Sequence, residues 1–126
     1  MRRLYRLPIQ IEICIANKEW ESALYQLRNI PNSDEHLVGL KKKVYHEWAK
    51  NADDSKRSEI AINGLSVPYD PLLENNIFII ILSIRLARIA QNKEKYDYFM
   101  QKIKNISPDI EEKLIWSEDN LDMWET

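Results

Sequence analysis

Glycine and cysteine are scarce in this 126-residue chain, which contains two glycines and one cysteine. Sheets and phosphate-binding loops use glycine for tight turns and for close approach of the backbone to a ligand. With glycine only at positions 39 and 64, a sheet-rich or glycine-loop fold is not expected. The single cysteine, Cys14, excludes an internal disulfide and every zinc site built on two or more cysteines. This cysteine usage fits a reducing compartment.

Catalytic signatures are also missing from the sequence. Four residues after His46 stands Lys50, at the place where a zinc-protease helix carries its second histidine. No P-loop, no dinucleotide-binding glycine motif and no Gly-x-Ser-x-Gly element occurs. Cys14 lies between Ile13 and Ile15, and we interpret it as a small core residue rather than a nucleophile. We therefore expect no enzyme activity, no metal site and no cofactor.

No apolar run in the chain is long enough to cross a bilayer. The longest uncharged apolar run is Ile77–Ile84, and Arg85 ends it far short of the ~20 residues that a span requires. The N-terminus opens with two arginines, as a signal peptide does, but Arg6, Gln10 and Glu12 interrupt the apolar region that such a peptide needs. We expect a retained N-terminus, a cytoplasmic location and no membrane span.

The formal net charge of −2 is distributed unevenly along the chain. Residues 1–63 carry 11 Lys and Arg against 9 Asp and Glu, whereas residues 64–126 carry 7 against 11. A nucleic-acid-binding protein usually has a strongly basic face. The basic groupings here are Arg2, Arg3 and Arg6 and the run Lys41–Lys43. Because the total is acidic, we interpret the lysine run as a solvated helix face and expect no nucleic-acid partner.

The strongest signal that is present lies between Asp70 and Asn92. Its apolar run fits a buried strand as well as a buried helix, because periodicity alone does not separate the two. Asp70 is a good N-cap and Pro71 suits the first helical position, and no glycine or further proline follows before Asn92. Apolar side chains would cover almost all sides of such a helix in its first half. The sequence therefore predicts a central helix over 71–91, the most buried helix of the fold.

Helix patterns fill the rest of the chain, so the sequence predicts an all-α fold with about seven helices. Pro8 is expected to open the first helix, and Asn17 to end it and to cap the second, which Pro31 ends. Ser33 or Asp34 is expected to cap the third. The other expected helices are one that includes Ile60, Ala61 and Leu65, one capped by Asn92 that includes Tyr96, Phe99 and Ile103, and one after Pro108 that includes Ile110, Leu114 and Ile115.

An apolar pattern recurs at two places that are 76 residues apart. If the pattern repeats at equal intervals, a third copy is expected halfway between these two places, and a weaker match to the pattern is present there. Each copy ends in a proline within two residues of its last member, namely Pro31, Pro68 or Pro108. The pattern therefore predicts three helix hairpins with a period of about 38 residues. The matched positions are Trp20, Ala23, Leu24, Leu27 and Ile30, then Arg57, Ile60, Ala61, Gly64 and Val67, then Tyr96, Phe99, Met100, Ile103 and Ile106.

The stretch ANKEWESALYQLRNIP resembles the second half of a tetratricopeptide repeat. Trp20, Ala23, Leu27 and Pro31 stand at that family's aromatic, small, large apolar and proline positions, and Tyr96, Ile103 and Pro108 fill three of these positions in the last copy. The resemblance implies one domain over 1–126, a right-handed stack of antiparallel hairpins with a C-terminal capping helix. The hairpins would span about 8–30, 34–67 and 71–106, and the cap 108–126. An orthogonal helix bundle is the alternative architecture.

The same resemblance implies where a partner would bind. In that family the first helix of each hairpin lines a concave groove, which points here to Tyr5, Glu12, Lys42, Tyr45 and Arg88. Aromatic residues and arginine are frequent anchors of protein interfaces. The alternative is that Tyr5 and Tyr45 pack against neighbouring helices.

The last ten residues place Leu121 and Trp124 among acidic residues. This segment fits the polar-faced cap that the end of a helical stack needs, and it also fits a short acidic helix offered to a partner's groove. A homodimer formed through an uncovered end of the stack is a further option.

These patterns lead to two hypotheses about function. The first is a small cytosolic adaptor or chaperone that holds a peptide or helix of another protein in the hairpin groove, with a build similar to the compact helical-repeat chaperones of bacterial secretion systems. The second is an immunity-type or inhibitor protein that neutralises an effector through the acidic second half of the chain.

Overall fold

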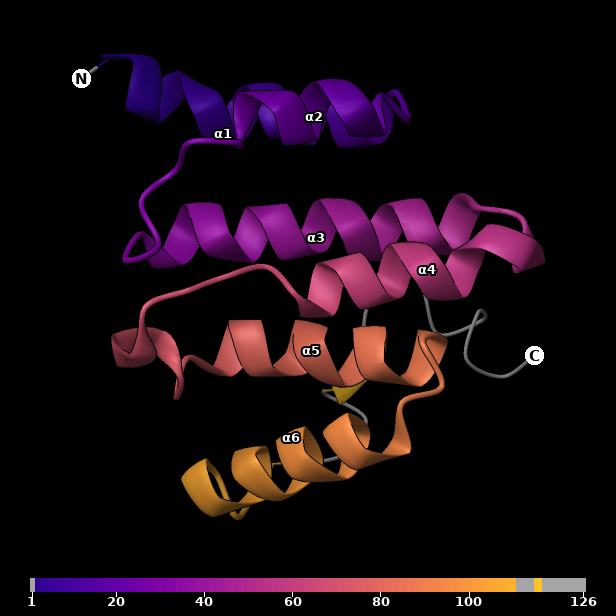
Figure 1. Cartoon of the computed structure of the whole chain (residues 1–126). Coiled ribbons are helices and arrows are strands. Elements are labelled where there is room, and N and C mark those ends of the chain that lie inside the picture. The colour runs from indigo at the N-terminus through magenta and orange to yellow at the C-terminus, as the bar shows by residue number, and fades with distance from the viewer. Residues whose placement is uncertain (1, 111–114, 117–126) are drawn as a thin grey trace.

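The computed structural model describes residues 2–110, 115 and 116, and within that part the side chains from Arg6 onward. This part of the chain contains six α-helices, one short 3₁₀ helix and no strand (Figure 1). The all-α fold class is therefore confirmed. The elements are α1 (Arg2–Ala16), α2 (Trp20–Gln26), α3 (Glu35–Asn51), α4 (Asp54–Leu65), the 3₁₀ helix η1 (Pro71–Leu73), α5 (Ile77–Ile89) and α6 (Lys93–Ile106).

Helices that follow one another in the chain also lie beside one another in space. The helices α3 and α4 form one antiparallel pair, and α5 and α6 form another. Helix α1 packs against α2, both contact α3, and α5 contacts both α3 and α4. Figure 1 shows the resulting stack, with α1 and α2 at one end, α3 and α4 in the middle, and α5 and α6 at the other end.

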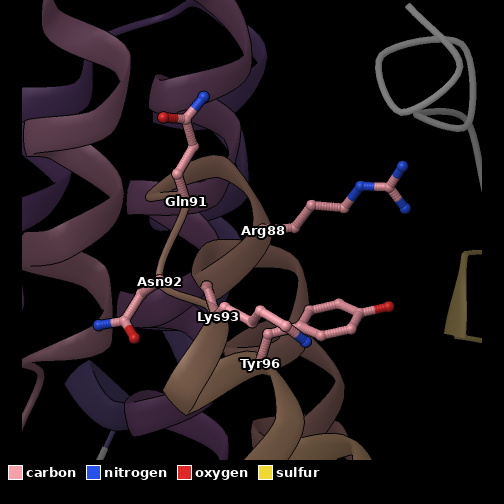
Figure 2. Close-up of a pocket in the computed structure, with 6 residues that line it drawn as sticks. Arg88, Gln91, Asn92, Lys93 and Tyr96 are labelled. Atoms are coloured by element: carbon pink, nitrogen blue, oxygen red, sulfur yellow. The ribbon is translucent and has the colours of Figure 1, made fainter.

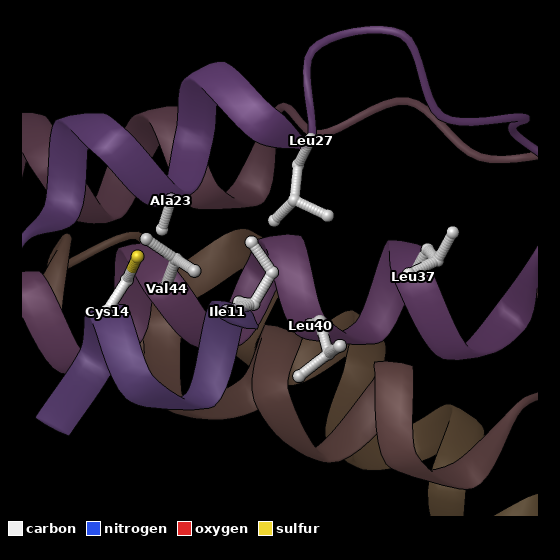
Figure 3. Packing of buried hydrophobic residues seen from close by; sticks show 7 residues of the cluster. All are labelled: Ile11, Cys14, Ala23, Leu27, Leu37, Leu40 and Val44. Atoms are coloured by element: carbon white, nitrogen blue, oxygen red, sulfur yellow. The ribbon is translucent and has the colours of Figure 1, made fainter. Parts of the chain in front are cut away.

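The first core cluster joins α1, α2 and α3, and Figure 3 shows its side chains meeting between these helices. Cys14 belongs to this cluster and is buried, with its Sγ 3.6 Å from Nε2 of Gln26 and 3.9 Å from Oγ of Ser22. The interpretation of Cys14 as a core residue is therefore confirmed. The members of the cluster are Ile11, Cys14, Ala23, Leu27, Leu37, Leu40 and Val44.

Helix α5 is enclosed on nearly all sides. Every residue from Leu82 to Ala87 is buried. On one side, Ile80 and Ile84 pack in a cluster with Phe99 of α6 and with further residues of α6 and of the segment after it. On another side, Leu86 packs with residues of α3 and α4. The expected central helix is thus present, and it forms because its apolar residues find partners in every neighbouring helix.

The central helix begins later than the sequence predicts. Asp70 accepts a hydrogen bond from the Leu72 amide at 2.9 Å, but it caps only the 3₁₀ helix η1. The α-helix starts at Ile77, where the side chain of Asn76 accepts a bond from the Ile79 amide at 3.0 Å. An asparagine side chain competes for backbone donors and so favours a cap over a helix interior. Asn76 therefore separates the turn from the helix, and the predicted start at residue 71 is wrong.

Three predicted boundaries in the first hairpin are also wrong. Pro8 lies inside α1, which begins at Arg2, so the proline removes one helical hydrogen bond without opening the helix. Glu19, and not Asn17, precedes α2 as its N-cap residue. Helix α2 ends at Gln26. Between Gln26 and Pro31, the amides of Leu27, Arg28 and Ile30 each bond to the carbonyl oxygen of the third preceding residue, which is a tighter turn than an α-helix. Pro31 disfavours the helical conformation for Ile30 and so prevents a helix from continuing through this residue.

Other boundary predictions are confirmed by the capping bonds. The carboxylate of Asp34 accepts from the Leu37 amide at 3.0 Å, and the side chain of Asn92 accepts from the Lys95 amide at 3.0 Å. The predicted seventh helix and most of the 108–126 cap lie outside the described residues. Of that region, residues 108–110, Ile115 and Trp116 are described, and Ile115 and Trp116 are buried against α5 and α6.

The first and last hairpins share one turn geometry. Lys18 and Gln91 are the two residues other than glycine with a left-handed backbone in the described part, with φ of 59° and 56°. In each turn the next amide bonds to the fifth preceding carbonyl: Glu19 to Cys14 at 2.8 Å and Asn92 to Ala87 at 2.9 Å. This is the Schellman pattern of a helix end. The two turns are therefore alike in structure as well as in the apolar sequence that follows them.

The repeated apolar pattern corresponds to equivalent burial. Its second and fourth positions are buried in all three copies, as Ala23 and Leu27, Ile60 and Gly64, and Phe99 and Ile103. Its first position is half-buried in all three. The repeat seen in the sequence thus marks the side of α2, α4 and α6 that faces the core.

Both glycines lie inside helices at close contacts between helices, and neither serves a turn. A Cβ at Gly64 would lie 2.8 Å from the Cβ of Tyr45 and 2.9 Å from a methyl group of Leu86. A Cβ at Gly39 would lie 2.8 Å from the ring of Phe78, which is 47% exposed. The middle copy of the repeat therefore has glycine where the others have Leu27 and Ile103, because α4 is squeezed between α3 and α5.

We expect Gly64→Ala to lower the free energy of unfolding by about 1–3 kcal/mol through overpacking. This loss would exceed the gain of up to about 1 kcal/mol that alanine brings to a helix interior. Gly39→Ala is the matched control, since the exposed ring of Phe78 can turn aside, and it should be neutral or stabilising. Urea denaturation of both variants measures the difference, and equal stability of the two would contradict this account of Gly64.

Candidate functional site

The helices α3 and α5 run side by side and leave a recess of about 100 Å³ between them, which we call the α3–α5 groove. Each helix contributes residues at i, i+3 and i+4, the spacing that places side chains on one face. The stripe from α3 is charged and polar, whereas the stripe from α5 is apolar except at its end. The lining residues are Lys43, His46 and Glu47 of α3 and Phe78, Ile81, Leu82 and Arg85 of α5.

A hydrogen-bonded network forms the polar wall of this groove. Nδ1 of His46 lies 2.8 Å from Oε2 of Glu47, and Nζ of Lys50 donates to Oε1 of the same carboxylate at 3.3 Å. The imidazole is almost completely buried, with 1% of the side chain exposed, whereas Glu47 keeps 22%. The carboxylate therefore accepts bonds from two neighbours on its own helix and still faces the groove.

The protonation states of this network follow from burial and charge. Burial lowers the pKa of His46, and the opposing effect of Glu47 does not offset it. The imidazole is then neutral near pH 7, and because a carboxylate only accepts, its proton lies on Nδ1. For Glu47, burial acts to raise the pKa, but the bond from His46 and the charge of Lys50 outweigh it and the pKa falls below its usual value.

Arg85 connects the groove to the segment after α6. Its side chain is buried, and its Nε donates to the carbonyl oxygen of Ile115 at 2.7 Å. A buried guanidinium needs such acceptors because an unsatisfied charge is costly in a protein interior. The bond fixes Ile115 and Trp116 beside α5.

A second hollow of about 440 Å³ lies at the turn between α5 and α6. Figure 2 shows Arg88 and Tyr96 extending toward the same side, while Gln91 points another way. The Arg88 guanidinium carbon lies 5.1 Å from the ring centroid of Trp116, and the Tyr96 and Trp116 rings stack at 6.4 Å. Nζ of Lys93, on the rim, bonds to Asp97 at 2.9 Å. The hollow is lined by Ala87, Arg88, Gln91, Asn92, Lys93 and Tyr96.

The structure separates two of the residues that the sequence analysis assigns to a binding surface. Glu12 is exposed and forms an ion pair with Lys43, at 3.0 Å, next to the groove. Lys42 is fully buried, with its Nζ donating to the Gly64 carbonyl at 3.1 Å and lying 5.6 Å from the Tyr69 ring centroid. Lys42 is therefore a core residue and cannot contact a partner directly, in contrast to the expectation from the sequence.

The other predicted residues do not meet at one place. Tyr45 is half-buried and stacks on Trp48 at 6.5 Å, so it packs between α3 and α4, as the alternative interpretation has it. Arg88 is exposed at the α5–α6 turn. Tyr5 belongs to α1, but its side chain is outside the described part of the chain. Leu121 and Trp124 also lie outside the described residues.

Sequence reasoning missed the residues that form the groove. It considered His46 only as part of a zinc motif and Arg85 only as the end of an apolar run. The available signal was the repeated spacing, because Lys43, His46 and Glu47 are 35 residues before Phe78, Ile81 and Leu82. Side chains at equal spacing on two adjacent first helices are expected to face each other.

The described residues include no group of three His, Cys, Asp or Glu side chains close enough to hold a metal ion. No helix in the described part of the chain is long and apolar enough to cross a membrane. No protein-family model matches the chain, and no similar curated protein or solved structure is found.

The buried ammonium group of Lys42 predicts a pH dependence of stability. Burial, together with the charge of Lys95, lowers the pKa of Lys42 from 10.5 to about 8. Between these two pH values the unfolded chain binds the proton more tightly, so the free energy of unfolding should rise with pH and become flat below about pH 8. The full rise is on the order of 3 kcal/mol.

Lys42→Met fills the same space without a charge and should abolish this rise. The variant should also be more stable than wild type at pH 7, since no buried charge remains. Denaturation of both proteins from pH 7 to pH 10 measures the difference between their free energies of unfolding at each pH. Both proteins contain the same tyrosines, so the ionisation of these side chains contributes equally to both curves and cancels in the difference. Parallel pH curves for the two proteins would refute the assignment of a buried, destabilising Lys42.

Proposed function

We propose that this protein is a non-catalytic protein-binding module, a small cytosolic adaptor or chaperone that holds a peptide or helix of another protein in the α3–α5 groove. The observation that carries the proposal is the composition of the groove. The ring of Phe78 is 47% exposed beside the charged side chains of Lys43 and Glu47. Aromatic anchors next to charged groups are typical of protein interfaces.

The proposal includes the finer architecture, a right-handed tetratricopeptide-like stack of three hairpins with a C-terminal cap. Three observations support it: the neighbour-by-neighbour packing, the matching turns at Lys18 and Gln91, and the equivalent burial of the repeated positions. In such a stack the first helices of the second and third hairpins are α3 and α5. These are the two helices that line the groove.

The inhibitor alternative depends on the acidic character of residues 64–126. Six of the 11 acidic residues in that half lie within 111–126, together with one of its seven basic residues. Residues 64–110 carry five acidic and six basic residues, so their surface is not acidic. The charge of the described residues therefore does not favour this alternative.

Selection of peptides from a displayed library on the immobilised full chain provides ligands for a test. We expect Phe78→Ala to weaken binding of a selected peptide about 30-fold, as truncation of an interface anchor does. Ile62→Ala is the matched control, because Ile62 is 49% exposed on α4, outside the groove. Its affinity should stay within about twofold of wild type.

Salt gives an independent readout of the same binding. A ligand held mainly by apolar burial should bind almost equally at low and moderate salt, whereas one held by surface charge should weaken steeply. Isothermal titration of the selected peptide at two salt concentrations measures this. Unchanged affinity of the Phe78 variant, or loss of binding in the Ile62 variant, would exclude the groove as the binding site.

A further inference from the structure

The outward side of α1 carries an apolar stripe that no helix of the described structure covers. Ile9 is 63% exposed and Ile13 is 53% exposed, although both are among the most apolar residues of the chain. Arg6 and Ala16 are exposed on the same side, at spacings of three residues from the isoleucines. A hollow of about 360 Å³ lies along this stripe. Its lining residues are Pro8, Ile9, Glu12, Ile13 and Ala16.

The opposite side of α1 shows what such a stripe requires. There Ile11 and Cys14 are buried in the cluster shared with α2 and α3. Within the stack each inner hairpin has a neighbour on both sides, as Figure 1 shows for α3 and α4. The end formed by α1 and α2 has a described neighbour on one side, and terminal faces of helical stacks are normally polar. Two exposed isoleucines one turn apart therefore indicate an interface.

The charges beside this stripe identify the partner chemistry. Arg6 lies at its N-terminal end, and the sequence adds Arg2 and Arg3 at the same end. Lys18, Glu19 and Glu21 follow its C-terminal end, and all three are exposed, so this end carries a net negative charge. The helix thus has a basic N-terminal end and a net acidic C-terminal end, and between them the stripe is apolar except for Glu12, which is paired with Lys43. Such a helix is complementary to a copy of itself in antiparallel orientation, whereas a parallel copy would place like charges together.

We propose that α1 pairs with α1 of a second copy of this chain, antiparallel about a two-fold axis between Ile9 and Ile13. Ile9 of each copy then packs on Ile13 of the other, and the Arg6 end of each faces the Glu19 end of the other. A two-fold interface makes every contact twice, so a small number of self-complementary residues suffices. The antiparallel helix dipoles favour the same orientation. The pairing uses none of the residues that line the α3–α5 groove, although Glu12 beside the stripe forms an ion pair with the groove residue Lys43. It is independent of the proposed function.

Sedimentation equilibrium of the full chain over about two decades of micromolar concentration tests the pairing. We expect a reversible dimer for wild type and an increase of at least about 100-fold in its dissociation constant for Ile9→Asp, since each dimer would bury two carboxylates. Ile62→Asp is the control: the same change at a similarly exposed isoleucine on α4 should leave the dimer intact. Helical circular dichroism should be unchanged in both, because the two positions are solvent-exposed.

Charge reversal tests the antiparallel orientation separately. Arg6→Glu alone and Glu19→Arg alone should each weaken the dimer about fivefold, because each change places like charges together at both ends of the interface. The double variant exchanges the two charges and should restore the affinity to within about twofold of wild type. A monomeric wild type, a dimer as sensitive to Ile62→Asp as to Ile9→Asp, or a double variant no tighter than the single ones would overturn the proposal.

Discussion

The burial of α5 on nearly all sides is the constraint on which the rest of the structure depends. Ile79, Ile80 and Ile84 are buried, and α3, α4, α6 and the Ile115–Trp116 segment are arranged around them. At the start of the helix, Ile77 and Phe78 remain 43% and 47% exposed. Each of these elements covers one side of the helix. The stacked hairpins thus allow the less apolar helices α3, α4 and α6 to enclose the strongly apolar helix α5.

This enclosure also explains why charged groups lie inside the protein. A helix buried on most sides carries its occasional charged residues inward, and each then needs a fixed partner. Arg85 has the Ile115 carbonyl, Lys42 has the Gly64 carbonyl, and His46 has Glu47. The bonds of Arg85 and Lys42 join elements that are distant in sequence, whereas His46 and Glu47 are neighbours on α3. Arg85 and His46 line the α3–α5 groove. The site proposed for binding thus arises from the polar groups that the central helix and its neighbour α3 bring together.

The sequence was sufficient to predict the fold class, the presence of the central helix, the Asn92 cap and, with Ser33 as the alternative, the Asp34 cap, because all of these depend on local spacing. It did not predict the groove. A lysine in the run Lys41–Lys43 looks solvated by composition, and only the position of α4 shows that Lys42 points inward. The start of α5 at Ile77 was missed for a similar reason. Asp70 and Asn76 are both good N-cap residues, and capping preference alone does not decide which of them begins the α-helix.

The claim that α5 is the centre of the structure is tested most directly by native-state hydrogen exchange, followed segment by segment. Amides of a helix that is enclosed by its neighbours α3, α4 and α6 exchange only when the whole molecule unfolds. We therefore predict that the amides of residues 77–89 are the last to exchange, with the free energy of global unfolding, while those of α2 at the end of the stack exchange earlier. Exchange of residues 77–89 as fast as that of residues 20–26 would contradict the account.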